Sequence, residues 1–162
     1  MAVSDYILEI DGIKGESQDD KHKDQIDIES YSWGCANSGS HGIGGGGGAG
    51  KVSFQDIHFT TRANKASPNL MLKCATGEHL KKAVLHIRKQ GDAQQEYYTV
   101  TMEDLIVSSY QSGGSNGSPV VHDTFSLNFA KIKFEYKPQK KDGSLDAAVT
   151  GGWDIKANKK TG

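Results

Sequence analysis

The stretch TFSLNFAKIKFEY, at positions 124–136, constrains the fold of this chain more than any other. Apolar residues alternate with polar ones along it, first at odd positions from Phe125 and then at even positions from Ile132. A period of two is typical of a β-strand whose faces meet different surroundings. The phase changes by one residue at 130–131, where no Asn-Gly or similar hairpin turn stands. We therefore predict one long strand with a β-bulge at 130–131, and a barrel rather than a flat sandwich, because bulges bend sheets towards closure.

The same alternation recurs along the chain and predicts a mainly β fold. Turns rich in Gly, Asn and Asp separate the alternating segments, as in antiparallel barrels. In 26–34 neither set of alternate residues is cleanly apolar, which indicates that both faces of that strand meet protein or a lined cavity. We predict a compact antiparallel β-barrel. Its further strands are expected at 6–10, 26–34, 52–59, 83–87, 96–102 and 105–110.

One segment, SPNLMLKCATG at 67–77, predicts a short α-helix at about residues 68–76. Ser67 is suited to cap the free N–H groups of the first turn, which proline also favours. Gly77 is suited to the left-handed conformation that ends a helix. Three apolar side chains are expected to form one buried stripe: Leu70, Met71 and Cys74.

Composition limits the classes of function. A chain of 162 residues predicts a single domain, 1–162, and a net charge of -1 argues against nucleic-acid binding, which needs a basic face. No apolar run approaches the roughly 20 residues of a membrane helix, and the N-terminal residues lack the pattern of a secretory signal. For Cys35 and Cys74 we expect reduced, mostly buried thiols, with one disulfide as the alternative.

The glycine-rich segment GSHGIGGGGGAGK, at 39–51, contains the P-loop spacing Gly45-x-x-x-x-Gly50-Lys51. Position 52 is valine, so no hydroxyl is available there for magnesium. The residues that follow alternate like a strand, whereas a P-loop leads into a helix N-terminus. We therefore expect no nucleotide site.

Two hypotheses remain for this segment: a mobile linker, or a loop that becomes ordered only against a partner. Each ordered glycine costs roughly 0.5–1 kcal/mol more conformational entropy than alanine, so fixing Gly44–Gly48 costs about 2.5–5 kcal/mol. A small domain stable by about 5–15 kcal/mol gains little from ordering such a loop alone.

No catalytic or metal motif stands out. The six histidines (22, 41, 58, 79, 86 and 122) form no HxxxH or HExxH pair, and there is no Gly-x-Ser-x-Gly elbow. We expect no catalytic residue, bound metal or cofactor. An enzyme with a dispersed site is the alternative.

Several motifs, in order along nearly the whole chain, carry a resemblance to a known family. They are KGES (14–17), YSWG (31–34), GAGKV (48–52), SPNLM (67–71), HIRK (86–89), LIVSS (105–109), LNFAKIKFEYKPQ (127–139) and Gly152-Trp153. The chain resembles the Hcp family, the haemolysin-coregulated proteins that form the inner tube of bacterial type VI secretion systems.

The resemblance implies a homo-hexameric ring that stacks into a tube, with sheath proteins around it and a VgrG spike at its tip. It implies small effector proteins carried in the lumen, and a protein made in the bacterial cytoplasm and secreted without a cleavable signal peptide. The protein is then found outside the cell or in the target cell. With no C-terminal toxin extension expected, it implies a carrier that is not an enzyme and does not insert into membranes by itself.

Site residues follow from the same resemblance. The ring-stacking loop comprises Gly39, Gly42, Gly44, Gly45, Gly46, Gly47, Gly48 and Gly50. Ser30 and Ser32 are expected to contact effectors in the lumen, or else merely to tolerate a crowded interface. Tyr31, Trp33 and Trp153 are expected in the core or in subunit packing. A stand-alone secreted effector or adhesin-like small β domain is the rival to the tube protein.

Overall fold

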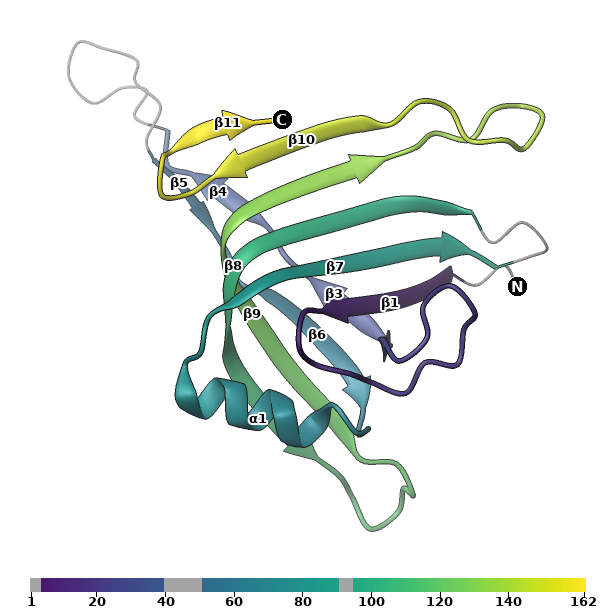
Figure 1. Cartoon of the computed structure of the whole chain (residues 1–162), viewed down its shortest axis with the longest axis vertical. Helices are drawn as coiled ribbons and strands as arrows, with labels where there is room; N and C mark the ends of the chain where they lie inside the picture. The colour runs from purple at the N-terminus through teal and green to yellow at the C-terminus, as the bar shows by residue number, and fades with distance from the viewer. Residues whose placement is uncertain (1–3, 40–50, 91–94) are drawn as a thin grey trace.

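The structure is a computed structural model that describes residues 4–39, 51–90 and 95–162. In these parts the chain forms one helix, α1 (Ser67–Thr76), and otherwise strands (Figure 1). The strands are β1 (Ser4–Ile10), β2 (Ile26–Ile28), β3 (Ser30–Ser32), β4 (Cys35–Asn37), β5 (Val52–Phe54), β6 (Ile57–Arg62), β7 (Leu80–Lys89), β8 (Glu96–Gly113), β9 (His122–Tyr136), β10 (Val149–Asp154) and β11 (Lys159–Thr161). Every pairing among the described strands is antiparallel, so the predicted mainly β, antiparallel class is confirmed.

The strands of the main sheet follow one another around a curved wall. The main path is β11-β10-β9-β8-β7-β1-β2, and β6 also pairs with the first half of β9 while β3 pairs with β6. β2 and β3 belong to one continuous segment, 26–32. The path from β1 through β7, β8, β9, β6 and β3 therefore returns to β1 through that segment, which gives the sheet its barrel-like curvature.

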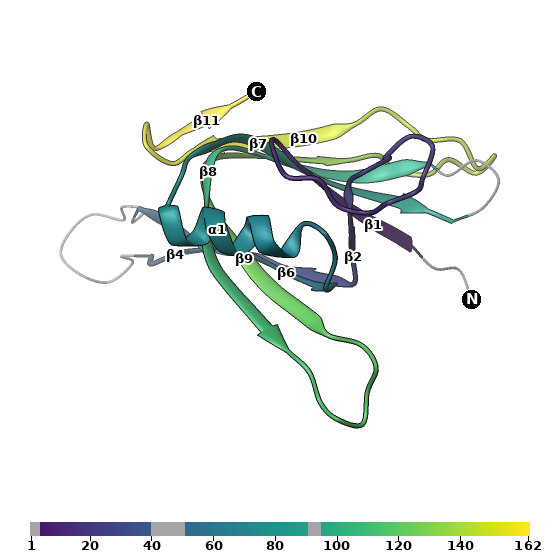
Figure 2. The ribbon, with the colours of Figure 1, turned by 60° about the horizontal axis from the view of Figure 1, so that its bottom comes forward.

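β9 is one continuous strand, as predicted, but the bulge predicted at 130–131 is wrong. The register between β8 and β9 stays in step there, with Glu103 opposite Lys131 and Leu105 opposite Phe129. The irregularity lies in β8 instead, where the register shifts between Val107 and Ser109. The phase change falls where β9 exchanges β6 for β10, and Asp104 of β8, at φ 51°, lies between the pairs on either side of this point. Figure 2 shows β8 and β9 passing from one layer into the other.

The predicted strand 26–34 is broken in two. Ile26 and Ile28 are buried, whereas Glu29 and Ser30 are both exposed before Tyr31 turns inward. The Glu29 N–H donates to Thr60 O of β6 at 2.8 Å, where the chain leaves its pairing with β1. The mixed pattern therefore arises in part from a phase change at the break, and within a single chain the side chains of Ser30 and Ser32 are exposed. Two other predictions differ in extent: 52–59 is split between β5 and β6, and 96–102 and 105–110 are joined in β8.

The predicted helix is confirmed within one residue as α1, and Gly77 ends it. Gly77 has φ 67°, and its N–H donates to Lys73 O at 3.0 Å. The predicted cap is wrong, because the N-cap position is Ala66 and no side chain caps the helix. The hydroxyl of Ser67 instead donates to the carboxylate of Asp123.

The helix buries a narrower stripe than predicted. Leu70 is fully buried and Cys74 is half-buried against the core, but Met71 is 46% exposed. Leu72 is also exposed, so one side of α1 presents apolar surface to solvent. Both cysteines are free thiols, as expected, but Cys35 is exposed rather than buried.

The core lies inside the curved sheet. Its largest fully buried side chains come from most of the long strands and from α1. They are Phe59, Phe125, Leu8, Ile26, Ile57, Leu70, Leu85, Met102, Leu105, Leu127, Val100 and Val107.

Candidate cargo and assembly surface

Polar side chains, most of them short, form two rows across β3, β6, β9 and β8. Directly paired residues of antiparallel strands project from the same face of a sheet. The first row is Ser30, Thr60, Thr124 and Gln111, and the second is Ser32, His58, Ser126 and Ser109. We call these eight side chains the polar face. Neither an acidic residue nor lysine or arginine occurs among them, and the next row on the same face adds Arg62, which pairs with His122.

The row between them fixes which way the polar face points. It consists of Tyr31, Phe59, Phe125 and Tyr110, which all lie in or against the core. Phe59 and Phe125 are fully buried and stack with ring centroids 5.2 Å apart. Because side chains alternate along a strand, the neighbouring polar rows must point outward.

α1 leaves the polar face open. Its Ser67 contacts Asp123, which has the same parity along β9 as Phe125 and is fully buried. The helix therefore packs on the inner side of this part of the sheet, as Figure 2 also shows for its position across β6 and β9.

Hydroxyl groups at the centre of the polar face satisfy one another. The hydroxyl of Ser126, which is 2% exposed, lies 2.7 Å from that of Ser108 and also contacts that of Ser109. The register shift in β8 turns these two consecutive serines towards Ser126. Ser30 and Ser32 lie on β3 at one end of the rows and are both exposed.

The three aromatic residues singled out in the sequence are half-buried and lie against the core. Tyr31 packs edge-on to Tyr6 at 5.7 Å, and burial raises its pKa. Trp33 packs edge-on to Phe134 at 5.9 Å. The indole Nε1 of Trp153 is buried without a hydrogen-bond partner among the described residues.

Of the glycines predicted to form the stacking loop, only Gly39 lies in the described part of the chain. It is exposed, and its N–H donates to Asn37 O at 3.0 Å. Gly42, Gly44, Gly45, Gly46, Gly47, Gly48 and Gly50 lie outside the described residues. The ribbon of β4 and β5 pairs Asn37 with Val52, so the two ends of the glycine-rich segment leave from adjacent strands.

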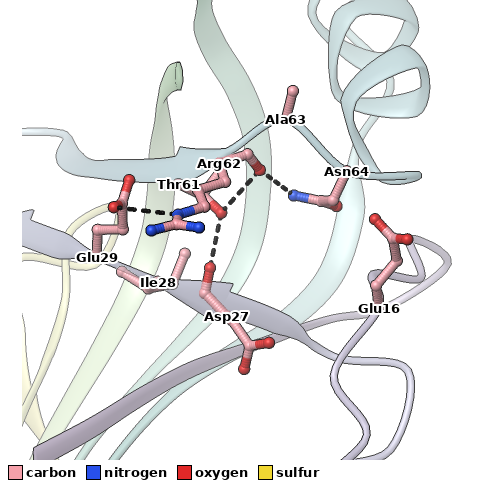
Figure 3. A pocket seen from close by; sticks show the side chains of 8 residues that line it. All are labelled: Glu16, Asp27, Ile28, Glu29, Thr61, Arg62, Ala63 and Asn64. Carbon is pink, nitrogen blue, oxygen red and sulfur yellow. Dashed lines mark hydrogen bonds and ion pairs between the residues drawn. The ribbon is translucent and has the colours of Figure 1, made fainter. Parts of the chain in front are cut away.

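A depression of about 460 Å³ lies beside the break between β2 and β3 (Figure 3). Two contacts cross it: the Thr61 hydroxyl donates to the backbone carbonyl oxygen of Asp27 at 2.6 Å, and Arg62 Nε lies 3.8 Å from Glu29 Oε2. Burial raises the pKa of the Asp27 carboxyl. The lining is Glu16, Asp27, Ile28, Glu29, Thr61, Arg62, Ala63 and Asn64, which includes no histidine, serine or cysteine to form a nucleophile–base pair.

The sequence of this fold matches a known protein family. A family model described as "Type VI secretion system effector, Hcp" matches residues 7–136. The chain belongs to the Hcp family. Protein hcp1 of Pseudomonas aeruginosa is 46% identical over 160 residues, which cover 98% of each chain.

Solved structures agree with this Hcp assignment. Hcp1 from Salmonella typhimurium is 36% identical, with a TM-score of 0.80 over 99% of this chain and 100% of that one. A structure of a type six secretion system protein is 28% identical, with a TM-score of 0.91 over 98% of this chain and 100% of that one. The Hcp of type VI secretion systems is a secreted protein. Among the described residues, none of the helical structure has the length and apolarity that a membrane crossing requires.

Sequence patterns located this Hcp surface only in part. Alternation along 26–34 predicted that Ser30 and Ser32 share one face of a strand. The other six residues of the polar face are placed by the register between strands that are distant in sequence. Sequence reasoning also missed a set of metal-type donors. In the part of the chain that the structure describes, one group, His22, His86 and Glu96, brings such donors together. The one sequence signal for this group is that His86 and Glu96 lie near the facing ends of two consecutive predicted strands.

Proposed function

We propose that this Hcp is a structural tube protein whose hexameric rings stack into the inner tube of a type VI secretion system and carry small effectors in the lumen. The observation that carries this proposal is the polar face. Four adjacent strands direct polar and mostly short side chains outward, while their alternate side chains form the core. Such a surface suits the wall of a water-filled channel, because it stays hydrated without filling the channel.

Effectors would meet Ser30 and Ser32 on this wall. Both are exposed, and β3 lies at the end of the two rows. Small hydroxyl side chains offer hydrogen bonds to a folded cargo without restricting its size. If the two serines only tolerate a crowded interface, enlarging them would disturb the ring rather than the cargo.

Ring formation is supported by exposed apolar side chains in separate places. A closed ring uses head-to-tail contacts, so each subunit needs two different complementary patches. Met71 and Leu72 lie on α1, whereas Tyr136 and Val149 are paired across β9 and β10. Val149 is 67% exposed, a large value for a valine in a strand.

Stacking of rings and contacts with the sheath and the VgrG spike complete the proposal. The glycine-rich segment would serve as the stacking element, because its ends are anchored by the β4–β5 ribbon. The protein would act as a carrier and not as an enzyme, and would need no cofactor.

Substitution of Ser32 by glutamine tests the cargo surface. The longer side chain projects from the wall where an effector would lie, so we expect co-purified effector to fall several-fold while the hexamer mass is unchanged. Co-expression with a small secreted effector, followed by pull-down and mass measurement, gives both readouts. Ser115→Gln, at an exposed position in the β8–β9 loop, is the matched control. Equal effector recovery from both variants would contradict the proposed lumen role, and loss of the hexamer in Ser32→Gln alone would favour a subunit interface.

A further inference from the structure

Two histidines and a glutamate from three separate segments converge beside the β7–β8 hairpin. His22 comes from the long connection between β1 and β2, His86 from β7 and Glu96 from the start of β8. His22 Nε2 lies 2.5 Å from Glu96 Oε1, and His86 Nδ1 lies 3.1 Å from Glu96 Oε2. One ligand atom from each residue lies within 4.8 Å of the others, and the imidazole rings are 4.5 Å apart.

The far nitrogen of each imidazole faces an acceptor. His22 Nδ1 lies 2.9 Å from the amide oxygen of Gln25, and His86 Nε2 lies 3.3 Å from a carboxylate oxygen of Glu9. With the Gln25 amide oriented so that its oxygen faces His22, both partner atoms accept, and on that basis we assign a proton to each far nitrogen. The near nitrogens, His22 Nε2 and His86 Nδ1, then direct lone pairs towards Glu96.

With both far nitrogens protonated, the near nitrogens would repel the Glu96 carboxylate unless a proton or a metal ion lies between them. One solution is a second proton on each ring, which would place two imidazolium groups 4.5 Å apart. Repulsion between the rings and the burial of His22, which is only 6% exposed, oppose that doubly protonated state, and Glu96 and Glu9 partly offset it. A cation bound by both rings and by Glu96 is the other arrangement that supplies the positive charge. Imidazoles that bind metals characteristically donate their other N–H to a carboxylate or carbonyl oxygen, as both do here.

We propose that His22, His86 and Glu96 form a binding site for a divalent transition-metal ion, with zinc the best match. Two imidazole nitrogens and one carboxylate oxygen are a donor set found in three-residue zinc sites, which leave a fourth position for water. Glu96 keeps 34% of its side chain exposed, so solvent reaches that position. The charges of Glu96 and Glu9 together offset that of a divalent ion.

The ion would fasten the β1–β2 connection to the sheet. In that connection Asp19 already pairs with Arg88 of β7, and the metal would add a second attachment three residues further along. A ligand that binds the folded chain but not the unfolded chain raises stability according to its concentration relative to Kd. The role inferred for the ion is structural.

Zinc binding to the purified chain, stripped of metal with a chelator, tests this inference. We expect one zinc per chain by isothermal titration and elemental analysis, and a rise in thermal midpoint on adding zinc. Cobalt should give the visible absorption of a low-coordinate site containing nitrogen donors. His86→Gln, which removes a ligand, should weaken zinc binding by much more than tenfold and abolish the cobalt spectrum. Glu9→Gln should weaken binding by a smaller factor, about tenfold, because it orients His86 without binding the ion.

His122→Gln is the matched control. His122 Nδ1 also faces a carboxylate, Glu29 at 2.9 Å, but among the described residues His122 belongs to no group of three metal-type donors. The zinc affinity of His122→Gln is compared with that of His86→Gln and not with that of a His22 variant, because His22 is buried and its loss could impair folding. Circular dichroism of the metal-free variants checks that they fold. Equal zinc affinity in folded His86→Gln and His122→Gln, or no saturable binding by the unaltered chain, would overturn the inference.

Discussion

At the scale of single residues, Arg88 is a charged side chain that the fold buries, with 4% of its surface exposed. Its Nε donates to Asp5 Oδ2 at 3.1 Å and its Nη1 to Asp19 Oδ2 at 2.9 Å. The hydrogen bonds from Arg88 lower the pKa of Asp19 to about 2. The guanidinium therefore holds two carboxylates of β1 and the β1–β2 connection against β7.

Replacing Arg88 by methionine should lower the free energy of unfolding by about 2–4 kcal/mol, because it leaves two partly buried carboxylates without their partner. Urea denaturation followed by circular dichroism measures the change. Arg62→Met is the control: Arg62 is 70% exposed and 3.8 Å from Glu29, and such surface pairs contribute less than about 1 kcal/mol. Equal losses in the two variants would contradict the role assigned to Arg88.

Sequence located residues whose role is local and missed those whose role depends on distant partners. Gly77 was predictable because the left-handed end of a helix is a property of the residue itself. Ser67 was assigned as a cap, but Asp123, far along the chain, takes its hydroxyl. His22, His86 and Glu96 come from three segments, and no spacing rule joins them.

At the scale of elements, period-two alternation located most strands because it reflects local burial. It misplaced the breaks and joins, since these depend on which neighbour a strand meets. β9 changes its phase where it exchanges β6 for β10, and the 26–34 segment breaks at Glu29 where it exchanges β1 for β6. Only Ser30 and Ser32 of the polar face were predicted, because the rest of that surface is assembled by strand register.

The pairing of β10 with β11 gives a test at this scale. A Cβ added at Gly152 would lie 2.6 Å from Thr161 Oγ1 and 2.9 Å from Thr161 O, whereas one at Gly151 meets nothing within 4 Å. Gly152→Ala should therefore destabilise the protein by about 1–3 kcal/mol through overpacking. Gly151→Ala should be nearly neutral. Hydrogen exchange should show earlier loss of protection in β10 and β11 for Gly152→Ala alone; unchanged protection there would contradict the close contact.

The glycine-rich segment gives a second test between elements. Replacing residues 44–48 by alanine should leave the monomer fold and ring intact but shorten stacked tubes, because the bulkier loop cannot approach a neighbouring backbone as closely. Electron microscopy of negatively stained protein measures tube length. Gly113→Ala with Gly117→Ala is the control, since an added Cβ meets nothing within 4 Å at either position. Tubes of normal length in the 44–48 variant would exclude a stacking role.

At the scale of the whole molecule, two kinds of surface formed by the described residues call for a partner. One is the polar face. The other consists of exposed apolar side chains on α1 and across β9 and β10. A closed ring would account for both, because head-to-tail contacts would cover the apolar patches and direct the polar face of every copy towards a common channel.

The mass of the protein in solution tests this account most directly. Sedimentation equilibrium over a range of concentrations should show a species of about 105 kDa, the mass of six copies of a 17.5 kDa chain. A single species of 17.5 kDa at every concentration would contradict the ring and favour a protein that acts as a separate small domain.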